Sequence, residues 1–281
     1  MVTQGPETIP DHWRNALVLM LAHGSKTTPE ATNVVLAQAS RLAARNLFSD
    51  VRAVFLRDNP HPKEIIDQAL QRDFFVVPFM TSEGYSTETL IPKAIGLAGP
   101  LTERSSLNTR HQIHICESIG THRKIEDHLV TLINEVISRN DLSIDDTVAV
   151  IASHGTARHP GNNRQSTLLE NRISGSCGVH EAHAVFIEEP PFITEWQTMT
   201  DLSNVLIIPH LMTFGRHAAV DVPTAVGIPP DTKAFQRALC AGQMYGPHET
   251  HGRRIWFAPT IGSFDTITDI VVERIRDRGL L

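Results

Sequence analysis

The chain has few cysteines and an excess of acidic residues. Its three cysteines are far apart in the sequence (Cys116, Cys177 and Cys240), so they form neither a disulfide framework nor a Cys-x-x-Cys metal or redox motif. Free thiols suit a reducing compartment, and we therefore expect a cytoplasmic protein. The 25 lysines and arginines are outnumbered by 31 aspartates and glutamates, and no basic run occurs, so we expect no nucleic-acid partner.

Long apolar runs are also missing. The first apolar stretch, Ala16–Ala22, is far shorter than the roughly 20 residues that span a bilayer, so we expect no membrane partner. The polar stretch 1–15 lacks the charged start and apolar core of a secretory signal, and we treat it as an N-terminal leader. The phosphate-binding pattern G-x-x-x-x-G-K-[ST] does not occur, which argues against an ATP-driven reaction, and nothing in the sequence points to an organic cofactor.

Short apolar runs alternate with amphipathic stretches along most of the chain. This alternation predicts an α/β fold with a parallel sheet covered by helices on both faces. In the first half we expect strands at 16–22, 51–56, 74–80 and 111–116, and helices at 28–46, 61–70, 87–97 and 121–139. In the second half the apolar runs 148–152, 184–187 and 205–209 predict strands in the same order.

The two halves are an internal duplication. LAHGS at residue 21 is matched by IASHGT at 151, VFLRDNP at 54 by VFIEEPP at 185, and VVPFMTSEGYSTETLIP at 76 by IIPHLMTFGRHAAVDVP at 207, all 131 residues apart. A fourth pair, ICESIG and FAPTIG, is offset by 142, which places an insertion of 11 residues within 224–252, expected in the loop-like stretch CAGQMYGPHETHG. We therefore predict two similar doubly wound, flavodoxin-like domains, at 16–140 and 147–281, with a cleft between them.

Polar residues stand where the strands of the second half end. His154 follows the first strand, Glu188 the second, and His210 and His217 the third. Because the carboxyl ends of parallel strands share one edge, these side chains are expected to converge there as a metal site. The first half keeps His23 but has Arg57 and Ser86 in place of Glu188 and His217, so the duplication indicates one active site rather than two.

Together these blocks resemble the sirohydrochlorin chelatases of the CbiX/SirB type, over residues 16–139 and 147–278. The resemblance implies ATP-independent insertion of Co²⁺, Fe²⁺ or Ni²⁺ into a tetrapyrrole. Its catalytic and metal-binding residues would be His154, His217 and Glu188, in the second domain only. We assign substrate contacts to His23, Arg158, Arg216 and His210, the two arginines pairing with substrate carboxylates.

Imidazole and carboxylate suit first-row divalent ions, and a histidine can also accept a proton that leaves a pyrrole. The leading hypothesis is therefore a lyase-class metal chelatase of cobalamin or siroheme biosynthesis, with the metal as substrate. Two alternatives stay open: a metal-dependent lyase or hydrolase that uses the same site on another substrate, and a metal or tetrapyrrole carrier without catalysis. The sequence also leaves open whether the chain forms a homodimer.

Overall fold

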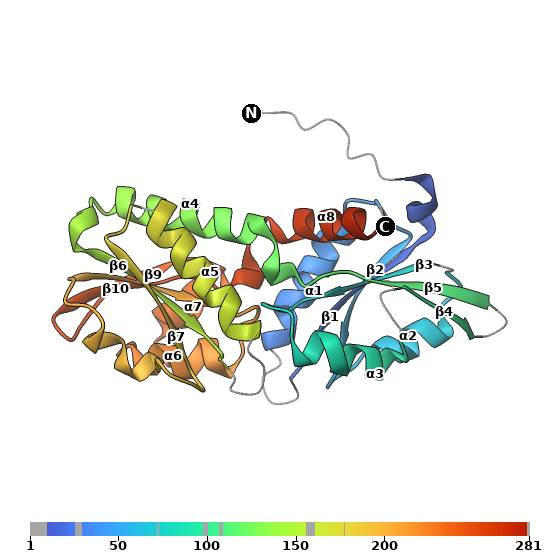
Figure 1. Ribbon diagram of the computed structural model, residues 1–281, viewed down its shortest axis with the longest axis horizontal. Helices are drawn as coiled ribbons and strands as arrows, with labels where there is room; N and C mark the ends of the chain where they lie inside the picture. Colours follow the sequence, from blue (N-terminus) through green and yellow to red (C-terminus); the bar gives the residue numbers. More distant parts are fainter. Residues whose placement is uncertain are drawn as a thin grey trace.

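The structure, a computed structural model, consists of two α/β halves side by side (Figure 1). It describes residues 10–25, 30–71, 73–97, 101–106, 109–155, 161–176 and 178–279. Each half has a five-stranded sheet, in the order β2-β1-β3-β5-β4 in the first half and β7-β6-β8-β10-β9 in the second. Four strands of each sheet are parallel, and the outermost strand, β4 or β9, is antiparallel to its neighbour. The repeated doubly wound fold predicted from the sequence is confirmed.

The strands of the two sheets occupy equivalent places in the duplicated sequence. In the first half they are β1 (Leu17–Ala22), β2 (Asp50–Phe55), β3 (Asp73–Pro78), β4 (Leu101–Ser106) and β5 (Thr109–Ile115). In the second half they are β6 (Thr147–Ser153), β7 (Glu181–Phe186), β8 (Asn204–Pro209), β9 (Tyr245–Thr250) and β10 (Arg253–Phe257).

Helices cover both faces of each sheet. Those of the first half are α1 (Glu30–Ala43), α2 (Pro62–Gln68), α3 (Ile91–Ile95) and α4 (Arg123–Arg139). Those of the second are α5 (Gly161–Ser176), α6 (Val222–Ala225), α7 (Lys233–Cys240) and α8 (Ile267–Gly279). Two π-helical turns, η2 (Ser86–Leu90) and η6 (His217–Asp221), lead into α3 and α6, and short 3-10 turns include η3 (Ile119–Thr121), η5 (Ile193–Thr198) and η7 (Ile261–Ser263). Among the described helices, none has both the length and the apolar character needed to cross a membrane.

Both central strands are apolar on both sides, as burial between two helical layers requires. Every residue of β1 and of β6 is buried. Along β1, Val18 and Met20 face the layer that contains α1, whereas Leu17 and Leu19 face the layer of α2 and α3. This continuous apolar run, rather than an alternating one, is what made the central strands easy to recognise in the sequence.

The last helix of each half packs on the sheet of the other half. α8, at the C-terminal end of the second half, contacts β3 and α1 of the first half, and α4 packs against α5 of the second half (Figure 1). Polar bonds accompany the exchange: Gln38 Nε2 on α1 donates to the carbonyls of Gly262 and Phe264, at 2.9 and 3.0 Å. The units of the sequence repeat and the packed bodies of the structure therefore differ by one helix on each side.

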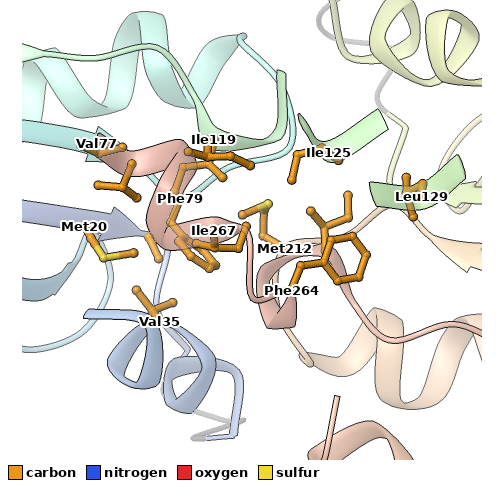
Figure 2. Close-up of a cluster of buried hydrophobic side chains, with 14 of the residues drawn as sticks. Met20, Val35, Val77, Phe79, Ile119, Ile125, Leu129, Met212, Phe264 and Ile267 are labelled. Atoms are coloured by element: carbon orange, nitrogen blue, oxygen red, sulfur yellow. The ribbon is translucent and has the colours of Figure 1, made fainter. Parts of the chain in front are cut away.

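One hydrophobic core runs through both halves because of this exchange. Figure 2 shows Phe79 and Ile119 of the first half beside Ile267 of α8, with Met212 of the second half close to Ile125 of α4. All of these side chains belong to a single buried cluster. The contact between the halves is thus a shared apolar interior and not a hinge between two separate cores.

The structure corrects the sequence reading at the sheet edges. Residues 101–106, for which we expected no element, form β4, and the stretch expected to be an inserted loop contains β9, the equivalent edge strand. Residues 96–100 separate α3 from β4, whereas 226–244 separate α6 from β9 and include α7. The extra residues of the second half therefore form a helix, which packs through Phe235 and Leu239.

Candidate active site

A histidine followed by a glycine ends the first strand of each half, and the backbone requires the glycine. Gly24 and Gly155 have φ angles of +74° and +71°, a left-handed conformation that other residues rarely adopt. A Cβ on Gly155 would lie 2.8 Å from the Cβ of Phe186, and one on Gly24 would lie 2.9 Å from the Cβ of Phe55. The same tight turn in both halves therefore holds the preceding histidine at the carboxyl edge of its sheet.

A π-helical turn follows the third strand of each half, a feature that the sequence did not reveal. In η6 the N–H of Val222 bonds to the carbonyl of His217, five residues earlier. Turns of this kind are rare and are often found at functional sites. Here the turn places His217 and Asp221 side by side, with His217 Nδ1 2.8 Å from Asp221 Oδ2.

His154 and His217 come together at the edge of the second sheet. Their ring centroids are 4.7 Å apart and the rings are nearly perpendicular, at 89°. His154 Nδ1 lies 2.7 Å from the carbonyl oxygen of Gly155, and an acceptor at that distance requires the proton to be on Nδ1. His217 Nδ1 in turn donates to the Asp221 carboxylate. In the neutral form, both rings therefore keep the lone pair of Nε2 for a ligand.

Glu188 completes this group only loosely. Its Oε1 lies 3.7 Å from His154 Nε2, and its side chain is exposed. Among the described residues, no group of three or more His, Cys, Asp or Glu side chains is arranged to hold a metal ion. The site thus offers two oriented imidazoles with a carboxylate nearby, and the complete His154, Glu188 and His217 ligand set stays a prediction.

These histidines open onto a cavity of about 880 Å³ between the two halves. The first half contributes residues that follow β1, β2 and β3. The second half contributes His154 and, after β8, Leu211, Met212, Thr213, Gly215, His217 and Ala218. The predicted cleft between the domains is therefore present, with its walls built from the carboxyl ends of both sheets. Its volume falls within the range of about 300–1,000 Å³ that is usual for small-molecule sites.

The wall of the first half faces the two histidines with a different set of side chains. His23 Nε2 lies 3.2 Å from Ser86 Oγ, the equivalent of the contact between His154 and His217. The His23 side chain is exposed and lines the cavity, and desolvation by the surrounding protein, together with the charges of Arg57 and His154, lowers its pKa below the ordinary value. His23 is accordingly neutral at pH 7.

The remaining predicted substrate contacts lie elsewhere. His210 does not line the cavity: it is 3% exposed, and its Nδ1 lies 3.4 Å from Ser153 Oγ. Burial lowers the pKa of His210 to about 4, so it is a neutral core residue. The prediction that His210 contacts the substrate directly is therefore wrong in this structure. Arg216 is exposed outside the cavity, with its Nε 3.4 Å from Asp221 Oδ1. Arg158 lies outside the described residues.

Two residues of the site were missed in the sequence. Asp221 was not considered, although a carboxylate four residues after a candidate ligand on a helix is within reach of it. Tyr85, which precedes η2, lines the cavity with a 57% exposed side chain. No spacing in the sequence points to Tyr85, because its position depends on how the two halves face each other.

Comparison with known proteins identifies the fold and the family. The CbiX family model matches the chain twice, over residues 17–136 and 148–278. The chain belongs to the CbiX family. Among CbiX relatives, it is 24% identical over 275 residues to a protein of Halobacterium salinarum described as a probable sirohydrochlorin cobaltochelatase, covering 93% of this chain and 91% of that protein.

Solved structures share the CbiX fold at lower identity. A Deinococcus radiodurans protein, DR2241, described as multi-domain with structural similarity to chelatases, superposes with a TM-score of 0.66 at 18% identity over 92% of this chain. The chain spans about half, 54%, of the length of that protein. SirB from Bacillus subtilis, solved with Fe³⁺, superposes with a TM-score of 0.64 at 15% identity, over 94% of this chain and 95% of SirB. The resemblance that the sequence blocks suggested is confirmed.

Proposed function

We propose that this protein inserts a divalent metal ion, Co²⁺, Fe²⁺ or Ni²⁺, into sirohydrochlorin or a closely related tetrapyrrole without ATP. The observation that carries the proposal is the pair formed by His154 and His217, which both line a cavity of about 880 Å³ in a chain of the CbiX family. The Nδ1 atom of each ring is hydrogen-bonded, which leaves Nε2 for a ligand. The relative described as a probable sirohydrochlorin cobaltochelatase supports the same reaction.

The site suits an ion that must be released after binding. Two imidazoles are borderline ligands that suit first-row divalent ions, and they leave the other coordination positions to water and to incoming pyrrole nitrogens. Glu188, beside His154, adds negative charge that attracts the cation. A closed cage of thiolates would retain the metal, whereas this open pair lets the macrocycle compete for it.

Insertion also requires proton transfer. One divalent ion replaces two pyrrole N–H protons, so two protons must leave as the metal–nitrogen bonds form. His23 stands on the opposite wall and is neutral near pH 7, so its ring accepts a departing proton in our proposal. Its lowered pKa then favours release of that proton to solvent. The metal is accordingly held from the second half while protons leave towards the first.

The test is anaerobic absorbance spectroscopy of sirohydrochlorin mixed with each metal. Wild-type protein is expected to accelerate the spectral change of insertion, and His154→Ala and His217→Ala are each expected to lose that acceleration. His180→Ala is the matched control, because His180 is exposed and precedes β7 at the opposite end of the strand from the cavity. Wild-type protein that binds the metal but accelerates insertion of none of the three ions would refute the proposal and favour a carrier.

A further inference from the structure

Within the described part of the chain, the cavity lining contains one permanently charged residue. The described lining consists of apolar side chains, glycines, hydroxyl groups, His23, His154, His217 and Arg57. Arg57 is the only permanently charged side chain in that lining, since no aspartate, glutamate or lysine contributes to it. Glu188 contacts His154 and Asp221 contacts His217, and neither carboxylate is part of the cavity lining.

Arg57 occupies the place in the first half that Glu188 occupies in the second. Both follow the second strand of their sheet, 131 residues apart, and both are tied to the turn after the first strand: the N–H of Arg57 donates to the carbonyl of His23 at 2.9 Å, and the N–H of Glu188 donates to the carbonyl of His154 at 3.0 Å. Equivalent backbones thus present opposite charges, the Arg57 cation on the cavity lining and the Glu188 anion beside His154.

The Arg57 guanidinium has no carboxylate partner within the described part of the chain. A positive charge in that position repels a metal ion. Its field is already felt by His23, because Arg57 contributes to lowering the pKa of that ring. What the position suits is an anion that enters the cavity with the ligand, since a guanidinium binds a carboxylate through two parallel hydrogen bonds.

We propose that Arg57 binds a carboxylate of the organic substrate and so fixes how the macrocycle is oriented between the two walls. The inference rests on the proposed function, which supplies a tetrapyrrole whose rim carries carboxylates. With one rim carboxylate held by Arg57, that edge of the ring lies against the first half. The second half then approaches the central nitrogens with His154 and His217.

The experiment measures binding of metal-free sirohydrochlorin by fluorescence titration, with no insertion step. Arg57→Gln is expected to raise Kd by about ten- to a hundred-fold, as loss of a charge-assisted hydrogen-bonded pair does, and Arg57→Lys by less. Arg52→Gln is the matched control, because Arg52 is an exposed arginine on β2 whose Nε pairs with Asp50 at 2.7 Å. Calorimetric Co²⁺ binding is expected to be no weaker than wild type in any of the three variants.

A second titration separates carboxylate binding from a structural effect. It compares the fully esterified macrocycle with the free acid, both in one mild detergent. Wild type and Arg57→Gln are expected to bind the ester equally. Raising the salt concentration is expected to weaken binding of the free acid to wild type more than its binding to Arg57→Gln. Equal loss of ester and free acid, or unchanged binding of the free acid, would overturn the role of Arg57 while leaving metal insertion intact. If wild type binds no sirohydrochlorin at all, the proposed function itself fails and takes the inference with it.

Discussion

The contact between His217 and Asp221 makes a quantitative prediction about metal affinity. Asp221 Oδ2 accepts the Nδ1 proton of His217 at 2.8 Å, which fixes the tautomer and keeps Nε2 free for the ion. The Asp221 side chain is 29% exposed, so solvent screens part of its charge. Asp221→Asn keeps an acceptor oxygen but removes the charge, whereas Asp221→Ala removes both.

Substitution of such an outer partner costs about ten- to a hundred-fold in metal affinity. Because of the partial exposure, we expect Asp221→Asn to raise the Kd for Co²⁺ by about tenfold, or about 1.4 kcal/mol. Asp221→Ala is expected to approach a hundred-fold. The initial rate of insertion at subsaturating metal should fall by the same factors, and metal-free sirohydrochlorin should bind as it does to wild type.

Isothermal titration calorimetry with Co²⁺ under anaerobic conditions measures these constants directly. Asp231→Asn is the control for loss of one exposed carboxylate, and Arg216→Gln removes the other partner of Asp221 without touching His217. An Asp221→Ala protein that binds Co²⁺ within twofold of wild type would show that His217 needs no orienting carboxylate or that it is not a ligand.

Three further predictions follow from the duplication and the core. Arg57→Glu, Ser86→His and Leu90→Asp together give the first half counterparts of Glu188, His217 and Asp221 beside His23, and calorimetry should show the Co²⁺ stoichiometry rise from one to two. A stoichiometry that stays at one refutes the equivalence of the two walls. His210 has a pKa of about 4 when folded, against about 6.5 unfolded, so the unfolded state binds more protons below pH 6.5 and stability falls as the pH drops towards 4. His210→Phe places the residue found at the equivalent position in the first half, Phe79. In urea unfolding, its effect on the free energy of unfolding should be more favourable at pH 5 than at pH 7.5 by about 2 kcal/mol, and an equal effect at both pH values contradicts this. Gln38→Ala should destabilise the protein by about 1–3 kcal/mol in the same assay, because two buried carbonyls of the other half lose their donor, and a change below 0.5 kcal/mol would show that water replaces the amide.

The sequence predicted the parallel strands because they are buried on both faces and read as unbroken apolar runs. It did not predict the antiparallel edges. β4 (LTERSS) is mostly polar, and β9 (YGPHET) contains Gly246 and Pro247, which are tolerated only because an edge strand leaves part of its backbone unpaired. Edge strands of this kind are defined by their neighbour, here β5 and β10, and not by a pattern of their own.

The candidate site was predicted as a set of residues but not as a geometry. Strand ends identified His154 and His217, because chain order and a parallel sheet suffice to bring them to one edge. His210 was misplaced, since the residue after a strand can turn inward as easily as outward, and its equivalent Phe79 in the first half already indicated an inward, buried position. Arg57 and Tyr85 emerged as cavity residues only once the two halves were seen facing each other.

The exchange of α4 and α8 determines what a half of this chain is able to do alone. Consider the N-terminal fragment that a cut near residue 143 would release. Its sheet would lack α8 on the face that α1 covers, and the apolar side of its own α4 would have no sheet to pack on. Two copies of such a fragment could bury both surfaces by trading these helices, and their cavity would then be lined equally by each copy. Joining the copies in one chain removes that symmetry requirement, so the second half is free to carry the acidic Glu188 at the position where the first half carries the basic Arg57.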